Sequence, residues 1–274
     1  MSAIKNILAI VGDPDTGQRA LATALQAAQY LEAHVDALHV RPDPLAGVPI
    51  IGESMSAPMI EEMTKMAEHT AVGRASKTRA MFDATVGGAA ASWIEDEGFE
   101  DQIVAQRACR ADLIVMAPDA GDKDTTAADT LSAALMQTGR AVLAAPHSVG
   151  PLSFKRVAIF WNGSAEATRA VTAAMPFLKR AEQVTVLRVE EEEWYASTED
   201  LEANFKFHGI SAVVAEVIPK GARTGEALLA AALSTNTGLL VMGAYTRSKL
   251  RQMILGSVTG YVLEHAKLPV LFCH

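Results

Sequence analysis

The second half of the chain repeats the order of apolar segments found in the first half. Self-similarity over a fixed spacing indicates that one structural unit occurs twice, and this limits the fold more than any single motif does. A segment rich in Pro and Gly, PHSVGPLS at residues 146–153, separates the copies and is typical of a linker. We therefore expect two domains, 1–147 and 152–274. The matching segments are residues 5–11 and 155–161, 35–40 and 184–189, 112–116 and 238–242, and 141–143 and 269–271.

Each copy alternates short apolar runs with longer amphipathic segments, a pattern of buried strands and helices. Such alternation predicts an α/β fold with a parallel sheet covered by helices on both faces. Right-handed crossovers then limit the topology. The expected strands lie near residues 5–11, 34–40, 90–94, 112–117, 141–145, 155–161, 183–189, 212–218, 238–243 and 269–273. The expected helices lie near residues 16–32, 58–82, 98–108, 127–138, 164–180, 197–207, 223–235 and 256–267.

The stretch from Leu239 to Val270 carries the clearest functional signal. An apolar run ends at Gly243, a polar and basic segment follows, and a helical pattern opens after Gly256 and Ser257. A glycine lets a ligand approach the backbone closely. The start of a helix presents unpaired N–H groups and the positive end of the helix dipole, which suits phosphate. The hydroxyl groups of Ser257 and Thr259 would add hydrogen bonds there.

The spacing of these residues resembles the nucleotide-binding motif of the universal stress protein family, which reads Gly, two residues, Gly, nine residues, Gly and then Ser or Thr. Gly243, Thr246, Gly256 and Ser257 occupy these positions, so Thr246 replaces the second glycine. The resemblance covers both copies and is similar to tandem members, in which two domains in one chain mimic the dimer of single-domain relatives. It implies two adenine-nucleotide alpha-hydrolase-like (Rossmann-like) domains, each a five-stranded parallel sheet in the order 3-2-1-4-5.

The first and fourth strands of such a sheet are neighbours where the strand order reverses, which is where ligands bind. The resemblance gives Asn162, at a position where family members usually carry Asp, a contact to the sugar or base of the nucleotide. An alternative is that Asn162 and Gly163 form a turn and Ser164 caps the next helix. Val189 could line an adenine site or be a plain core valine. The predicted ATP-binding residues are Asn162, Val189, Met242, Gly243, Thr246, Gly256, Ser257, Val258 and Thr259.

The first copy lacks the motif. Alignment back from the last strand puts Ala128 and Asp129 where Gly256 and Ser257 stand. Nearby carboxylates would repel phosphate at short range, so we expect ATP in the second copy alone. An alternative role for these acids in cation binding is possible, but a solvated charged loop is favoured and no metal site is predicted. The acidic residues are Asp119, Asp122, Asp124 and Asp129.

Composition excludes several classes of function. The net charge of −8 argues against a nucleic-acid partner, and no run approaches the ~20 apolar residues of a membrane helix. Cys109 and Cys273 lack metal-like spacing, which favours a reducing cytoplasm. The histidines are scattered, and neither a Gly-x-Ser-x-Gly elbow nor a Walker loop occurs, so no catalytic residues are predicted and ATP hydrolysis would be slow at most.

The first copy also contains an excursion at residues 42–82, where a long helix carries Met59, Met63 and Met66 along one side. Methionines at this spacing usually pack in a core or an interface; a lid or partner surface is the other interpretation.

The resulting hypothesis is a cytoplasmic regulatory module of the stress response that binds an adenine nucleotide, either a monomer with pseudo-dimeric domains or a homodimer. Because Thr246 and Asn162 depart from the ATP-binding pattern, the alternative is a scaffold that acts through protein partners without nucleotide. A third possibility, an adenylate-transferring enzyme, would need a catalytic constellation that the sequence does not display.

Overall fold

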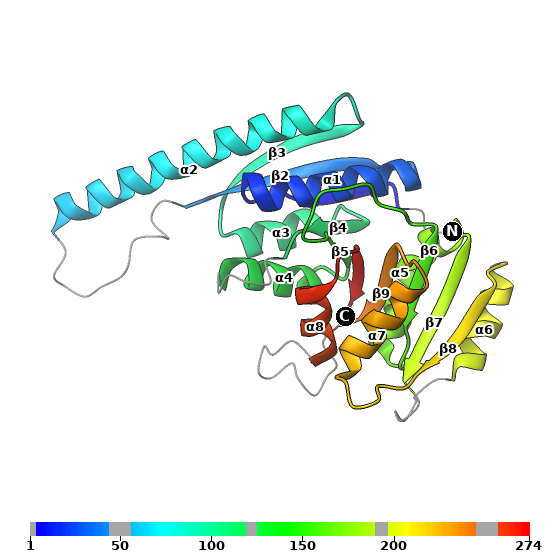
Figure 1. The fold of residues 1–274 in the computed structure, drawn as a ribbon. Coiled ribbons are helices and arrows are strands. Elements are labelled where there is room, and N and C mark those ends of the chain that lie inside the picture. Colours follow the sequence, from blue (N-terminus) through cyan, green and yellow to red (C-terminus); the bar gives the residue numbers. More distant parts are fainter. Residues whose placement is uncertain (1–3, 44–55, 119–124, 190–196, 245–256) are drawn as a thin grey trace.

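A computed structural model describes residues 4–43, 56–118, 125–189, 197–244 and 257–274. Its described strands form one ten-stranded sheet in the order β3-β2-β1-β4-β5-β10-β9-β6-β7-β8, with helices on both faces (Figure 1). Neighbouring strands are parallel except β5 and β10, which pair antiparallel. The predicted α/β architecture and the order 3-2-1-4-5 are confirmed, because each half of the sheet shows that order.

The first half supplies five strands and four helices among the described residues. The strands are β1 (Asn6–Ile10), β2 (His34–Pro42), β3 (Ala91–Gly98), β4 (Leu113–Met116) and β5 (Ala141–Ala144). The helices are α1 (Pro14–Leu31), α2 (Ala57–Val86), α3 (Glu100–Ala108) and α4 (Thr125–Gln137).

The second half supplies the same succession of elements. The strands are β6 (Arg156–Phe160), β7 (Gln183–Val189), β8 (Ala212–Val217), β9 (Leu239–Gly243) and β10 (Val270–Cys273). The helices are α5 (Ala165–Leu178), α6 (Thr198–Phe207), α7 (Thr224–Ser234) and α8 (Ser257–His265).

Strand β3 is longer than its apolar residues suggested. The sequence predicted a strand near 90–94 and a helix from 98, whereas β3 continues to Gly98. Its charged end pairs with β2, whose Arg41 forms ion pairs with Glu95 and Glu97 at 3.0 and 2.9 Å. Ion pairs, rather than apolar side chains, stabilise this end of β3. The apolar pattern used to place strands therefore did not indicate it.

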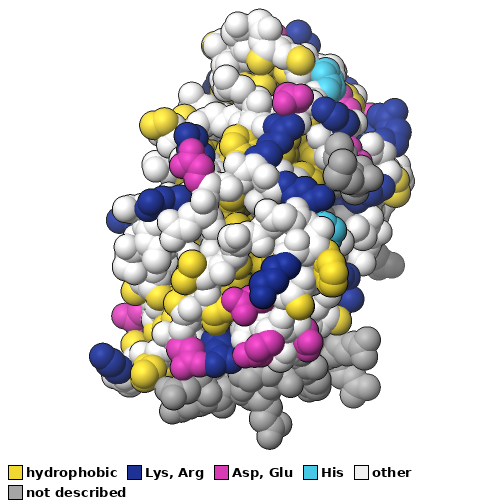
Figure 2. Space-filling model, turned by 90° about the vertical axis from the view of Figure 1, so that its right-hand side faces the viewer, with side chains coloured by type: hydrophobic (Ala, Val, Ile, Leu, Met, Phe, Trp, Pro, Cys, Tyr) yellow, Lys and Arg dark blue, Asp and Glu magenta, His cyan; other side chains and the backbone are white. Residues whose placement is uncertain are grey.

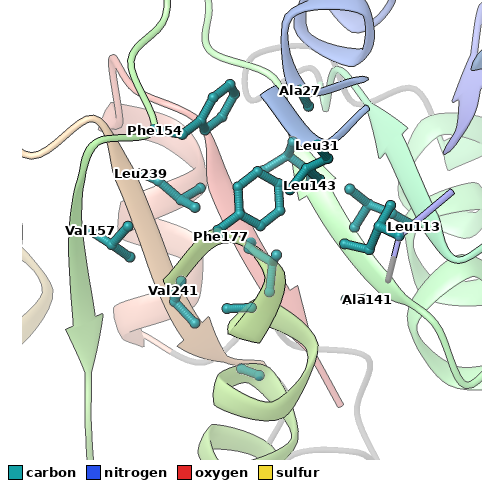
Figure 3. Packing of buried hydrophobic residues seen from close by; sticks show 14 of the residues in the cluster. Ala27, Leu31, Leu113, Ala141, Leu143, Phe154, Val157, Phe177, Leu239 and Val241 are labelled. Atoms are coloured by element: carbon teal, nitrogen blue, oxygen red, sulfur yellow. The ribbon is translucent and has the colours of Figure 1, made fainter. Parts of the chain in front are cut away.

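The core consists of two apolar layers, one on each face of the sheet, and both layers run through the two halves. The layer below α1, α2, α5 and α6 includes Leu31, Phe154 and Phe177 (Figure 3). The other layer lies below α3, α4, α7 and α8. The rings of Phe154 and Phe177 have centroids 5.3 Å apart and join the linker to α5.

Polar contacts fix the linker against the first half. The side-chain amide of Gln26 in α1 donates to the carbonyl of Gly150 at 3.0 Å, and its oxygen accepts from the backbone N–H of Leu152 at 2.7 Å. Arg180, just after α5, donates to the carbonyl of Tyr30 and pairs with Glu32. The two halves are therefore joined by side chains as well as by the sheet.

Helix α2 extends beyond the body of the molecule at its amino-terminal end (Figure 1). Met59 and Met66 are 55% and 66% exposed, so they do not pack in the core of this chain, and their packing in an interface or partner surface stays a prediction. The predicted helix is present, but the part of α2 that carries these methionines extends past the sheet and does not cover it.

No described helix is both long and apolar enough to span a bilayer. On the face shown in Figure 2, Lys and Arg side chains are scattered, with Asp and Glu side chains between them.

Candidate functional site

The carboxyl ends of β6, β7 and β9 meet at one edge of the sheet because these strands are parallel neighbours. Phe160 of β6 lies opposite both Leu187 of β7 and Met242 of β9. Asn162 follows β6, Val189 ends β7 and Gly243 ends β9, so these three predicted site residues lie along the same edge. Order reversal between β6 and β9 makes this the expected place for a ligand in a doubly wound sheet.

Asn162 forms the local turn that the sequence suggested. Its side-chain oxygen accepts a hydrogen bond from the backbone N–H of Ser164 at 3.2 Å. Gly163 has a φ of 66°, a conformation that favours glycine. The hydroxyl oxygen of Ser164 then caps α5 by accepting from the N–H of Ala167 at 3.1 Å. The side-chain nitrogen of Asn162 makes no hydrogen bond to the described residues, so two donors remain for a ligand.

Gly243 is required by packing, independently of any ligand. A Cβ at this position would lie 2.7 Å from the backbone nitrogen of Ala167 and 2.8 Å from the Cβ of Glu166. The end of β9 therefore contacts the first turn of α5 so closely that only glycine fits. Sequence spacing assigned this glycine to the phosphate loop and did not indicate the contact with α5.

Met242 and Val189 are core residues in this structure. They are 4% and 5% exposed and belong to the apolar layer that also contains Phe160. The side chain of Val189 is therefore a core residue, and its role beside an adenine stays a prediction. Both residues lie next to the strand ends that form the edge.

The described part of α8, Ser257–His265, lies within the helix that the sequence predicted near residues 256–267. Val258 packs near α7, where a Cβ on Gly225 would lie 3.2 Å from the Cα of Val258. Thr259 is buried at 6% exposure. Thr246 and Gly256, and the side chain of Ser257, lie outside the described residues.

A charged pair beside Gly243 was not anticipated from the sequence. Glu166 is 5% exposed and pairs with Arg169 at 3.2 Å. The guanidinium of Arg169 also donates to the carbonyl of His274 at 2.6 Å, and the ring of His274 donates to the carbonyl of Ala244 at 3.3 Å. The only sequence signal was an acid in the first turn of a helix, which is favourable against the helix dipole in any protein.

The equivalent edge of the first half differs. Ala128 and Asp129, which the alignment places opposite Gly256 and Ser257, lie in the described part of α4, so an acid stands in the first half where the second half has Ser257. Asp129 is exposed. Asp119, Asp122 and Asp124 lie outside the described residues. Within the part of the chain that is described, no three His, Cys, Asp or Glu side chains converge as metal ligands would.

A Ser–His–Asp group at the opposite edge of the sheet lacks the geometry of a catalytic triad. The hydroxyl of Ser92 donates to Asp36 at 2.5 Å, and both Ser92 and Asp36 approach the same ring nitrogen of His34, at 2.8 and 3.3 Å. A triad requires Ser and Asp on different ring nitrogens. Burial alone would raise the pKa of Asp36, but hydrogen bonds from Ser92 and Asn6 lower it below its ordinary value.

Comparisons with known proteins agree with this geometry. Residues 153–274 match the family model described as Universal stress protein family. A universal stress protein from Archaeoglobus fulgidus has a similar structure, with a TM-score of 0.66 at 18% identity, covering 98% of this chain and 95% of its own. A functionally unknown protein from Pseudomonas aeruginosa superposes with a TM-score of 0.55 at 16% identity, over 99% of this chain and 92% of its own. These likenesses show the shared fold. Among curated proteins, no sequence matches the chain.

Proposed function

Because residues 153–274 match the model of the universal stress protein family, we propose that this chain is a nucleotide-binding regulatory module of the stress response. Its single adenine-nucleotide site lies in the second half, and ATP is the expected ligand. The observation that carries this proposal is the spacing of Gly243, Thr246, Gly256 and Ser257, together with a strand-order reversal between β6 and β9.

In the proposed site, one group of residues contacts the sugar or base of the nucleotide and another group contacts its phosphates. Asn162 offers its side-chain N–H groups to the sugar or base, while Val189 and Met242 back the adenine from the core. The motif spacing assigns Gly243, Thr246 and Gly256 to the phosphates. Ser257, Val258 and Thr259 supply the N–H groups and hydroxyls of the first turn of α8, where the positive end of the helix dipole stabilises negative charge.

Titration calorimetry of the full chain with ATP tests the proposal. Wild type is expected to release or absorb heat at millimolar ATP or below, and Gly256→Val is expected to weaken binding at least about tenfold, because a side chain would occupy the space of the phosphate. Ala128→Val, the aligned position in α4, is the matched control and should bind like wild type. Absence of heat and of thermal stabilisation at millimolar ATP would contradict the proposal.

The alternative is a scaffold that acts through protein partners without nucleotide. The exposed Met59 and Met66 on the projecting part of α2 favour it, because methionine adapts well to binding surfaces. Mass spectrometry of gently purified protein separates the two functions: a co-purified adenine nucleotide supports the module, and its absence combined with a null ATP titration supports the scaffold.

A further inference from the structure

A groove lies between the first turn of α1 and the middle of α2, in the first half of the chain. Its volume is about 560 Å³, within the range of small-molecule sites. The α1 wall carries Asp13 and Asp15, and the α2 wall carries Arg74 and Lys77. Negative charge on one wall therefore faces positive charge on the other.

These opposite charges do not pair with each other. Among the described residues, the side chains of Asp15, Arg74 and Lys77 form no ion pair or hydrogen bond. The carboxylate of Asp13 caps α1: one oxygen accepts from the N–H groups of Asp15 and Thr16 at 2.8 and 3.1 Å, and the other accepts from the hydroxyl of Thr16. The charged side chains of the two walls therefore line the same groove without pairing across it.

Gly73 on the α2 wall has no packing reason to be glycine. A Cβ at Gly73 would meet no atom within 4 Å, whereas one at Gly17 of α1 would lie 2.5 Å from a methyl carbon of Val11. Glycine in a helix interior is unfavourable, and Gly73 lies within a 30-residue helix. Its effect here is to open the groove and leave the backbone approachable.

We propose that this groove binds a small zwitterion of the amino-acid class. The ligand's carboxylate lies against Arg74 and Lys77, its ammonium group lies against Asp15 with the charge of Asp13 beside it, and its chain passes over Gly73. An anion alone would face two carboxylates, and a cation alone would face two basic groups. A zwitterion is the ligand whose charges match both walls. This inference is independent of the nucleotide site.

Thermal shift and calorimetry of the full chain with the common amino acids, one at a time at millimolar concentration, test this proposal. At least one is expected to raise the melting temperature in proportion to its occupancy. Acetate and methylammonium, which each carry one of the two charges, should have a clearly smaller effect. Arg74→Gln and Asp15→Asn should each weaken binding about tenfold, because each removes a charged partner.

Two further variants separate binding from folding. Lys65→Gln makes the same change of charge on α2 outside the groove, and it should bind like wild type. Gly73→Ala should raise the melting temperature of the ligand-free chain and still weaken binding, a combination that a destabilised fold does not produce. Failure of every amino acid to bind, an effect of acetate or methylammonium as large as that of the best amino acid, or unchanged binding in Arg74→Gln and Asp15→Asn would overturn the proposal.

Discussion

At the scale of single residues, Gly243 combines two demands that the sequence cannot separate. Its place in the motif suggests a close approach by phosphate, and its contact with α5 excludes a side chain even without ligand. Local signals were sufficient for Asn162 and Ser164, because a turn followed by a helix cap involves neighbours in sequence. The contact between Gly243 and Ala167 joins residues far apart in sequence, so no local pattern could predict it.

Gly243→Ala is expected to lower the free energy of unfolding by about 1–3 kcal/mol, because its Cβ would overlap the backbone of α5. Urea denaturation measures the change. Gly73→Ala is the matched control: its Cβ meets open space, and helix propensity should stabilise the chain by about 1 kcal/mol. Equal stability of Gly243→Ala and wild type would show that α5 can shift to accommodate the Cβ. Close approach of a ligand would then be the remaining explanation for glycine at this position.

His39 provides a pH-dependent contribution to stability. It is fully buried, its Nδ1 donates to the carbonyl of Val11 at 2.7 Å, and its Nε2 has no partner among the described residues. Burial lowers the pKa of His39, while the hydrogen bond to Val11 and the charge of Glu95 oppose the shift, and Arg74 and Arg41 add to it. A proton on Nε2 would be buried without an acceptor.

The unfolded chain therefore binds a proton at His39 more readily than the folded chain does. Stability from this residue is fully present above the unfolded pKa of about 6.5 and falls as the pH decreases from there toward the lower folded pKa. One such group contributes at most about 1.4 kcal/mol per pH unit. His39→Asn, whose amide can still donate to Val11, should flatten the slope of unfolding free energy between mildly acidic and neutral pH.

His208→Asn makes the same change at an exposed position after α6 and should keep the wild-type slope. If denaturation of His39→Asn and wild type showed parallel pH dependence, the protonation of His39 would not be coupled to folding.

At the scale of elements, apolar periodicity placed the described helices and strands, because each element buries one face or one run against the sheet. Periodicity failed where burial was absent. The end of β3 is held by ion pairs to Arg41, and the first half of α2 shows helical spacing with no surface to cover. A pattern of residue types indicates that a side can be buried, but it does not reveal whether the neighbouring element reaches it.

Helix α2 should therefore differ in stability along its length. Its buried residues are Ala71, Ala75, Thr78 and Phe82, so residues 57–70 have no buried side chain. An isolated helical segment of this length is marginal in water. Hydrogen exchange measured by mass spectrometry should show markedly faster exchange for residues 57–70 than for residues 71–86. Uniform protection along α2 would instead indicate that another copy or partner covers the projecting end.

At the scale of the whole molecule, the internal repeat predicted the same strand order in both halves. The register agrees: Ile7 lies opposite Leu113 in one half, and Val157 lies opposite Leu239 in the other. The sequence did not reveal that β5 and β10 would join the halves into one sheet. Both strands are apolar and could equally have been covered by helices, and the choice depends on contacts between copies that no local pattern encodes.

The antiparallel pair of β5 and β10 joins the two halves of the sheet. Leu143 lies opposite Leu271, and the flanking pairs are Val142 with Phe272 and Ala144 with Val270. All of these residues are buried. A fragment of residues 152–274 would expose β10 as an apolar edge strand with unpaired N–H and C=O groups, which favours pairing with another strand. Because β5 and β10 are so alike and pair antiparallel, a second β10 can take the place of β5.

We therefore expect the fragment to form a symmetric homodimer through β10, measured as twice its own mass by light scattering after size exclusion. Leu271→Lys should weaken this dimer by placing charges near the twofold axis, where two like charges would face each other across the strands. Circular dichroism of the variant separates loss of pairing from loss of folding. A folded fragment that stays monomeric at high concentration would contradict this prediction. It would show that β10 pairs only with the particular side chains of β5.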